Sequence, residues 1–123
     1  MSRKKLRAGV VGVGSLGQHH ARLYASMEQV ELVGIVETDA ARAEEIAGKH
    51  GARVFPSVEA LASEVDMASV ASPTTTHEPA TSALIDAGVA TLVEKPIAAS
   101  LEEAERLVDR ARGRGVPLMV GHI

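Results

Sequence analysis

The chain has 123 residues, of which 46% are apolar and 24% are charged, and it contains no cysteine. Its length and composition are those of one globular domain, and a formal net charge of −3 excludes a basic face for nucleic acid or for an anionic membrane. The absence of cysteine excludes a disulfide framework, a thiolate metal site and a cysteine nucleophile, and we expect no metal site of another kind.

The basic start of the chain and the apolar run behind it do not form a signal peptide, because glycines interrupt a run that is already short. No segment approaches the ~20 apolar residues that span a bilayer. We therefore expect a cytoplasmic protein that does not contact a membrane.

An apolar run at residues 6–11 predicts a central strand, and a glycine-rich loop follows it directly. Gly12, Gly14 and Gly17 form G-x-G-x-x-G, the dinucleotide-binding fingerprint. In that motif the first glycine allows a sharp turn, the second lets backbone approach a pyrophosphate, and the third lets a helix pack close to the sheet. Three glycines at this spacing also occur in tight turns without a ligand. The other motifs of the chain are therefore needed to distinguish a dinucleotide-binding loop from such a turn.

A helix is predicted over residues 15–27, where Leu16, His20 and Leu23 recur at helical spacing. The N–H groups at its start, around Ser15 and Leu16, would point at the phosphates of a bound dinucleotide. His20 lies on the apolar stripe of this helix, which makes a packed structural role at least as plausible as a functional one.

The next buried-type strand, at residues 31–36, ends at Glu37, which lies 20 positions after Gly17. A carboxylate here can accept hydrogen bonds from the adenosine ribose hydroxyls and would repel a 2′-phosphate, so Glu37 favours NAD over NADP. Thr38 could add a hydroxyl contact. The alternative is that both residues only open the following helix, which Asp39 caps.

Polar, turn-forming residues follow the fourth apolar strand, which is predicted at residues 66–71. Ser72, Pro73 and Thr74 could line a cofactor edge, with Pro73 stiffening the turn. His77 is either a hydrogen-bond donor in the crevice or an exposed residue at the start of the next helix. The two threonines between Thr74 and His77 favour a helix cap over a ligand contact.

The fifth strand, predicted at residues 89–93, runs into Glu94-Lys95-Pro96. Two adjacent charged side chains followed by a rigid proline project from a restrained backbone. Lys95 could hydrogen-bond a substrate hydroxyl or carry a proton. As an isolated tripeptide the sequence is more typical of a surface turn, but its place at the end of a central strand favours a role in chemistry.

Strand and helix patterns alternate along the chain, with no long structureless loop and no second domain in residues 1–123. This alternation predicts one α/β domain with a doubly wound, six-stranded parallel sheet in the order 3-2-1-4-5-6. A crevice would then lie outside the carboxyl ends of the first and fourth strands. The strands are predicted at residues 6–11, 31–36, 52–55, 66–71, 89–93 and 117–121, and the helices at 15–27, 39–47, 57–62, 77–87 and 101–111, the last ended by Gly113 and Gly115.

Taken together, these residues resemble the amino-terminal Rossmann domain of the glucose-fructose oxidoreductase, inositol dehydrogenase and rhizopine-catabolism (Gfo/Idh/MocA) family. The resemblance covers nearly the whole chain, and Glu94-Lys95-Pro96 is its most specific motif. Its other parts are Gly12-x-Gly14-x-x-Gly17-x-x-His20-Ala21, the acid Glu37 and Ser72-Pro73-Thr74-x-x-His77.

The resemblance implies an NAD(P)-dependent dehydrogenase of sugars, cyclitols or nucleotide sugars, with NAD the expected cofactor. It assigns Lys95 to the reacting hydroxyl, where the lysine assists proton transfer as hydride moves to C4 of the nicotinamide. It assigns Glu37 to the adenosine ribose and Glu94 to the nicotinamide ribose region. The pyrophosphate would be held by Gly12, Gly14, Ser15, Leu16 and Gly17, and Ser72, Pro73, Thr74 and His77 would lie on the nicotinamide side.

Members of the family carry a second domain with the substrate pocket, which has no counterpart in this chain. We therefore expect the chain by itself to bind dinucleotide without turning over a sugar, and a homo-oligomer is possible. One alternative is a stand-alone NAD(H)-binding regulator without catalysis. Another is a methyltransferase-like domain, since those also combine a glycine loop with an acid at the end of the second strand, although Glu94-Lys95-Pro96 disfavours it.

Overall fold

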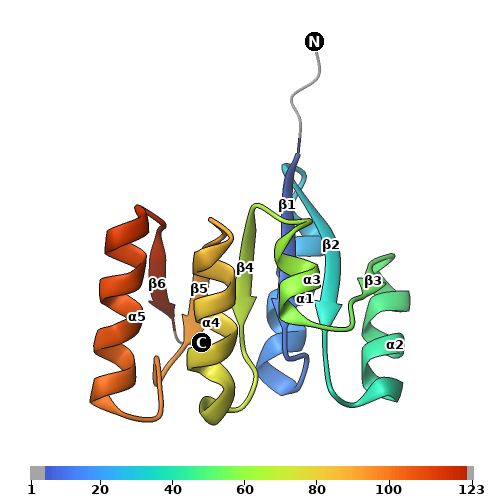
Figure 1. Ribbon diagram of the computed structural model, residues 1–123. Helices are drawn as coiled ribbons and strands as arrows, with labels where there is room; N and C mark the ends of the chain where they lie inside the picture. Colours follow the sequence, from blue (N-terminus) through green and yellow to red (C-terminus); the bar gives the residue numbers. More distant parts are fainter. Residues whose placement is uncertain (1–4, 122–123) are drawn as a thin grey trace.

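Six parallel strands form one sheet in the order β3-β2-β1-β4-β5-β6, which confirms the predicted fold class and strand order (Figure 1). The computed structural model describes residues 5–121. The strands are β1 (Leu6–Val11), β2 (Val30–Val36), β3 (Arg53–Val54), β4 (Met67–Val70), β5 (Ala90–Glu94) and β6 (Leu118–Gly121). The helices are α1 (Ser15–Ser26), α2 (Ala40–His50), α3 (Val58–Ala62), α4 (His77–Asp86) and α5 (Leu101–Arg114), with a short 3₁₀ turn, η1 (Thr74–Thr76), before α4.

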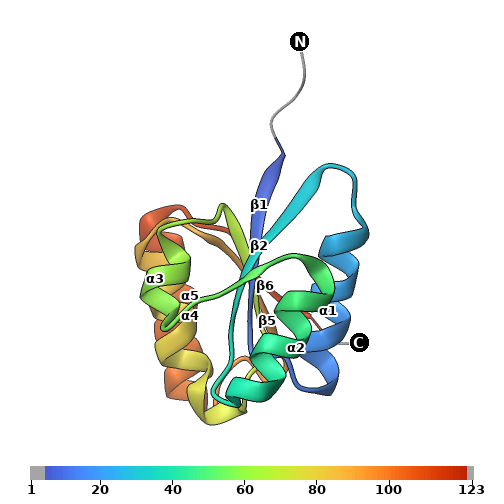
Figure 2. The same ribbon diagram turned by 90° about the vertical axis from the view of Figure 1, so that its right-hand side faces the viewer.

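Helices cover both faces of the sheet, with α1 and α2 on one face and α3, α4 and α5 on the other (Figure 2). On the first face, Ala21 of α1 and Ile46 of α2 pack against Ile35 of β2. On the second face, Leu84 of α4 packs against Val93 of β5 within a larger aliphatic cluster. Small aliphatic side chains let helices approach a parallel sheet that is buried on both faces.

Side-chain caps fix three helix starts at the predicted residues. The Asp39 carboxylate accepts the Arg42 N–H at 3.1 Å, the Ser57 hydroxyl accepts the Ala60 N–H at 3.1 Å, and the Ser100 hydroxyl accepts the Glu103 N–H at 3.2 Å. Each bond satisfies one of the backbone donors that a helix start leaves free. The starts of α2, α3 and α5 therefore follow from local sequence.

The prediction that Gly113 helps to end the last helix is wrong, because α5 continues through Gly113 to Arg114. Only Gly115 terminates it, in the left-handed conformation at φ 66°. Gly113 is exposed, while Leu107 and Ala111 bury the opposite side of the helix. Burial of that face outweighs the roughly 0.5–1 kcal/mol by which one glycine disfavours a helix.

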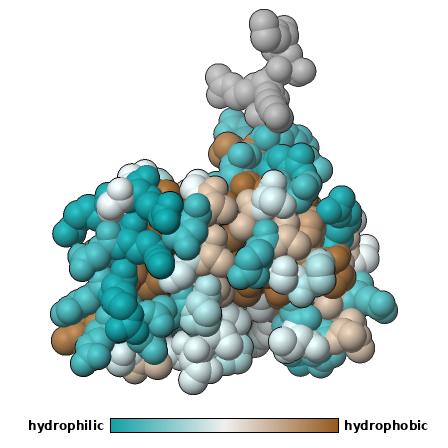
Figure 3. All heavy atoms as spheres, in the orientation of Figure 1, coloured by the Kyte–Doolittle hydropathy of each residue, from teal (hydrophilic) through white to brown (hydrophobic). Residues whose placement is uncertain are grey.

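Hydrophilic side chains gather over α5, on the outer surface of the domain (Figure 3). There Arg106 pairs with Glu78 at 2.8 Å and Arg114 pairs with Asp86 at 3.0 Å, joining α5 to α4. Exposed pairs of this kind contribute little to stability. Within residues 5–121, no helix is long and apolar enough to cross a membrane, and no cluster of histidine and acidic residues is arranged to hold a metal ion.

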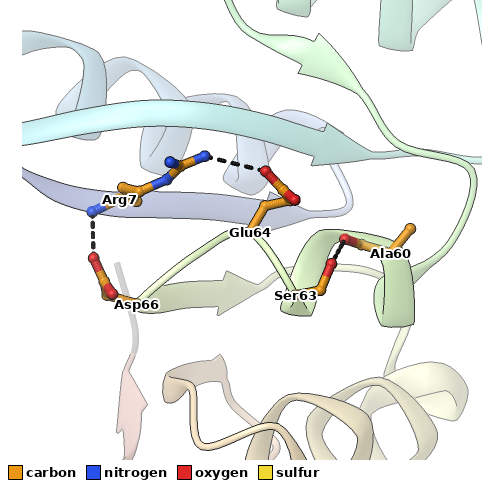
Figure 4. A network of polar contacts seen from close by, with 5 residues as sticks. All are labelled: Arg7, Ala60, Ser63, Glu64 and Asp66. Carbon is orange, nitrogen blue, oxygen red and sulfur yellow. Dashed lines mark hydrogen bonds and ion pairs between the residues drawn. The ribbon is translucent and has the colours of Figure 1, made fainter.

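At the amino ends of the strands, polar contacts fix β1 beside the segment that enters β4 (Figure 4). The Arg7 N–H donates to the Asp66 carboxylate at 2.9 Å, and the Arg7 guanidinium donates to Glu64 at 3.3 Å. Nearby, the Ser63 hydroxyl donates to the Ala60 carbonyl at 2.8 Å at the end of α3. These contacts hold together the two strands whose opposite ends form the crevice.

Candidate functional site

A cleft of about 390 Å³ opens at the carboxyl ends of β1, β2 and β4. This is the place where the strand order reverses direction and where ligands of doubly wound sheets bind. The strand ends contribute Val11, Gly12, Val36, Glu37, Thr38, Ser72, Pro73 and Thr76, and the neighbouring helices contribute Val58, Glu59, Pro79 and Ala80.

Gly12 joins the three strand ends that surround the cleft. Its backbone has φ 88°, a conformation that favours glycine, and its N–H donates to the Val36 carbonyl at 2.8 Å. A Cβ at this position would lie 2.5 Å from the backbone nitrogen of Ser72. A Cβ on Gly17, in turn, would collide with the Gly12 carbonyl oxygen. Both glycines are therefore required by close packing of the loop itself.

Gly14 differs from the other two glycines because the protein leaves open space around it. A Cβ at Gly14 would meet no described atom within 4 Å. Gly14 is the N-cap residue of α1, and no side chain among residues 5–121 caps this helix. Ser15 and Leu16, the first helical residues, are exposed. The free N–H groups and the positive end of the helix dipole are thus open to an anion, which is what a pyrophosphate requires.

Glu37 ends β2 and turns its carboxylate toward the glycine loop. Its Oε1 accepts the Val13 N–H at 2.9 Å, and its Oε2 accepts the Asp39 N–H at 3.0 Å and the Thr38 hydroxyl at 3.4 Å. Partial burial by itself would raise the pKa of Glu37, but these hydrogen bonds and the charge of Arg42 outweigh it and hold the pKa below its ordinary value. The carboxylate is therefore an ionised acceptor on the wall of the cleft.

Ser72 and Pro73 line the cleft from the end of β4, as predicted. Thr74 begins the 3₁₀ turn and does not line the cleft. The prediction of a threonine cap is wrong in part: Thr76 takes the N-cap position of α4, but its hydroxyl bonds to Ser72 Oγ at 2.7 Å and to the Pro73 carbonyl at 2.6 Å. Thr76 thereby shapes the loop instead of capping the helix.

His77 is neither in the cleft nor exposed. Its side chain is 2% exposed and lies between two loops, with Nδ1 2.9 Å from the Pro96 carbonyl oxygen and Nε2 2.7 Å from the Ser72 carbonyl oxygen. Both ring nitrogens are occupied by backbone groups. The imidazole thus ties the end of β4 to the segment that leaves β5.

Glu94, the last residue of β5, and Lys95, which follows it, have opposite environments. The Glu94 carboxylate is buried, and its Oε1 lies 2.6 Å from Nε2 of His20, which is also buried. Lys95 is exposed, its N–H donates to the Gly121 carbonyl at 3.0 Å, and the Lys95–Pro96 peptide bond is cis. The lysine ammonium is therefore free to meet a ligand while its backbone is fixed.

The structure brings five of the predicted site residues onto one cleft: Gly12, Glu37, Thr38, Ser72 and Pro73. It places Gly14, Ser15 and Leu16 at the open helix start and leaves Lys95 exposed at the end of β5. Sequence reasoning missed the wall formed by Val58, Glu59, Pro79 and Ala80. These residues carry no motif, and only the packing of α3 and α4 beside the crevice brings them there.

Comparison with known proteins agrees with this geometry. Residues 6–122 match the family described as the oxidoreductase family with an NAD-binding Rossmann fold (GFO_IDH_MocA). The chain belongs to this family. The predicted resemblance is therefore confirmed, and the glycine loop and cleft are parts of an NAD-binding Rossmann domain.

Three relatives illustrate the match. UDP-N-acetylglucosamine 3-dehydrogenase of Acidithiobacillus ferrooxidans is 44% identical over 118 residues, covering 96% of this chain and 37% of that protein. Inositol 2-dehydrogenase 3 of Saccharopolyspora erythraea is 38% identical over 117 residues, covering 93% and 35%. The structure of GenD2 from gentamicin A biosynthesis, in complex with NAD, has a TM-score of 0.91 at 35% identity and covers 97% of this chain and 35% of that chain. The chain thus spans little more than a third of these relatives' length.

Proposed function

We propose that the chain is the NAD-binding domain of a dehydrogenase that transfers hydride between NAD and a hydroxyl group of a sugar, cyclitol or nucleotide sugar. The observation that carries the proposal is the open start of α1 directly beside the loop residue, Val13, whose N–H the ionised Glu37 accepts. This pairing offers N–H donors to phosphates and an acceptor to ribose hydroxyls, the set of groups that a dinucleotide needs. Relatives named for UDP-N-acetylglucosamine and for inositol support a polyhydroxylated substrate.

The cofactor would lie along the carboxyl edge of the sheet. Gly14 leaves room for the pyrophosphate beside the N–H groups of α1, and Glu37 and Thr38 face the adenosine ribose. Ser72 and Pro73 lie toward the nicotinamide half, and behind them are Thr74 in the 3₁₀ turn, His77 at the start of α4 and Glu94 at the end of β5. The nicotinamide, when bound, supplies a C4 position that accepts or gives hydride.

Lys95 is the proposed catalytic residue. Its exposed side chain can hydrogen-bond the reacting hydroxyl, and in its neutral amine form it can accept the proton that leaves that hydroxyl when hydride moves. We propose that the groups that bind the sugar lie outside residues 1–123 and that these residues alone bind cofactor without turnover. The greater length of the relatives is consistent with such a division.

Calorimetric titration of the 123-residue chain with NADH tests the proposal, with S-adenosylmethionine titrated in parallel. We expect saturable, one-to-one binding of NADH and no heat of binding for S-adenosylmethionine. Binding of the methyl donor without binding of NADH would replace the proposal with a methyltransferase-like function. A parent protein that binds NADH but catalyses no hydride transfer from any of the three substrate classes to NAD would favour a regulatory module.

Glu37→Gln should reduce the preference for NAD over NADP by about tenfold or more, because the neutral amide neither repels a 2′-phosphate nor accepts ribose hydroxyls as strongly. Glutamine keeps an oxygen that can accept the Val13 N–H, so the loop should stay in place. The affinities for NADH and NADPH are measured by calorimetry on the same preparation.

Glu45→Ala provides the matched control for net charge. Glu45 is exposed on α2 and does not line the cleft, so its loss should leave the cofactor preference unchanged. If Glu37→Gln retains the original ratio of NADH to NADPH affinity, Glu37 does not select the cofactor. An equal change in both variants would attribute the effect to overall charge.

A further inference from the structure

Two buried histidines outside the cleft both contact the short segment that carries Lys95. His20 belongs to α1 on one face of the sheet, and His77 belongs to α4 on the other (Figure 2). Each stands three residues after a cofactor loop, His20 after Gly17 and His77 after Thr74. Two loops that are far apart in sequence are thus each joined to the exit of β5.

His20 holds the residue before the lysine. Its side chain is 8% exposed and that of Glu94 is 6% exposed, and their closest atoms, Nε2 and Oε1, lie 2.6 Å apart. A carboxylate in such a position needs a donor, because burial without one is strongly unfavourable. Among the described residues the His20 ring is the only side-chain partner of this carboxylate. The contact therefore decides where the Glu94 side chain, and with it the end of β5, can lie.

His77 holds the residue after the lysine. Its ring nitrogens lie 2.9 Å from the Pro96 carbonyl oxygen and 2.7 Å from the Ser72 carbonyl oxygen. Carbonyl oxygens only accept, so the ring makes both bonds when each nitrogen carries a hydrogen. The imidazole connects the loop at the end of β4 directly to the backbone of Pro96.

The lysine backbone is anchored as well, through the Lys95 N–H that donates to the Gly121 carbonyl at 3.0 Å. Three consecutive residues are therefore fixed by contacts to α1, β6 and α4, while the Lys95 side chain remains exposed. Such an arrangement restrains the base of a side chain without occupying its functional end.

We propose that His20 and His77 are positioning residues that hold Lys95 in register with the bound cofactor. This inference rests on the proposed catalytic role of Lys95. Each histidine links that lysine to a loop at the cofactor crevice, so the distance between ammonium and nicotinamide is set by both links. A misplacement of about 1 Å can lower a rate by about 100-fold, so loss of one link should reduce kcat with little effect on cofactor affinity.

Paired amide substitutions in the complete dehydrogenase test the role of His20. The side-chain nitrogen of glutamine falls near the position of Nε2, whereas that of asparagine falls near Nδ1 and is too short to reach Glu94. We expect His20→Gln to retain most of kcat and His20→Asn to lose about tenfold or more. The affinity for NADH should change less than threefold in both, and His19→Asn, an exposed neighbour on α1, should match the wild type.

At His77 we expect the same two substitutions, to asparagine and to glutamine, to rank in the opposite order of kcat. His77→Asn keeps the donor that faces Pro96, and His77→Gln keeps the donor that faces Ser72. Since Pro96 adjoins the lysine, we expect the asparagine variant to retain the higher kcat. All rates are divided by the number of NADH-binding sites found by calorimetry, so partial unfolding does not count as lost catalysis.

The outcomes separate this inference from the proposed function. If Lys95→Ala leaves kcat unchanged, the catalytic assignment fails and the positioning role fails with it. If Lys95→Ala abolishes turnover but all four histidine variants keep wild-type kcat per binding site, only the positioning role is wrong. A fall in melting temperature or in the number of binding sites, with kcat per site unchanged, would show that the histidines serve stability alone.

Discussion

Gly14→Ala should lower the affinity for NADH by about 10- to 100-fold while leaving the domain folded. The new Cβ meets no protein atom within 4 Å, and the φ of −70° suits any residue, so the structure tolerates alanine. The same Cβ would stand where the pyrophosphate approaches the backbone, and hydrogen bonds from N–H groups to a charged acceptor are worth about 1.5–3 kcal/mol each. Calorimetry gives the affinity, and thermal unfolding gives the stability.

Gly17→Ala provides the comparison, because it changes the same motif but should lower the stability of the domain, which Gly14→Ala should leave unchanged. Its Cβ would collide with the Gly12 carbonyl oxygen, so the loop or α1 must shift. Overpacking of this kind destabilises by about 1–3 kcal/mol, which lowers the melting temperature by several degrees in a domain of this size. A Gly14→Ala protein that binds NADH as tightly as the wild type would remove Gly14 from the pyrophosphate site.

Lys95→Ala should lower kcat in the complete dehydrogenase by about 10²–10⁴-fold, the usual contribution of a group that transfers a proton. The affinity of the domain for NADH should change little, because Lys95 is exposed and does not line the cleft. Steady-state rates with the parent protein and calorimetry with the domain measure the two effects separately.

Lys49→Ala controls for the loss of one exposed positive charge, since Lys49 lies on α2 away from β5. It should leave both kcat and cofactor affinity unchanged. Turnover of the Lys95→Ala protein near the wild-type rate would contradict the catalytic role. A large loss of NADH affinity would instead make Lys95 a cofactor-binding residue.

The fold followed from the sequence because its signals are local and repeated. Apolar runs alternate with capped helices, and parallel strands joined by right-handed crossovers leave few arrangements, so even the strand order could be predicted. The end of α5 could not, because burial of Leu107 and Ala111 outweighed the local preference of Gly113. The 3₁₀ turn at Thr74–Thr76 was missed because the bonds of Thr76 to Ser72 and Pro73 compete with a helix cap.

The placement of candidate residues was predictable where they lie at strand ends, as Glu37 and Pro73 do on the cleft. It was not predictable where a contact joins distant segments. His20 and Glu94 are 74 positions apart, and only the packing of α1 on the sheet brings their side chains together. A packed position was one of the two interpretations of His20 that the sequence left open, and His20 is buried, but nothing in the sequence indicated its partner.

The chemical shifts of the backbone amides of the ¹⁵N-labelled chain, followed during titration with NADH, test most directly whether the strand-end crevice is the cofactor site. We expect saturable shifts at residues 12–17, at Glu37 and Thr38, and at Ser72 and residues 74–76, with the outer surface of α5 unaffected. Absence of shifts under saturating NADH, or shifts confined to α4 and α5, would contradict an NAD-binding site at the glycine loop.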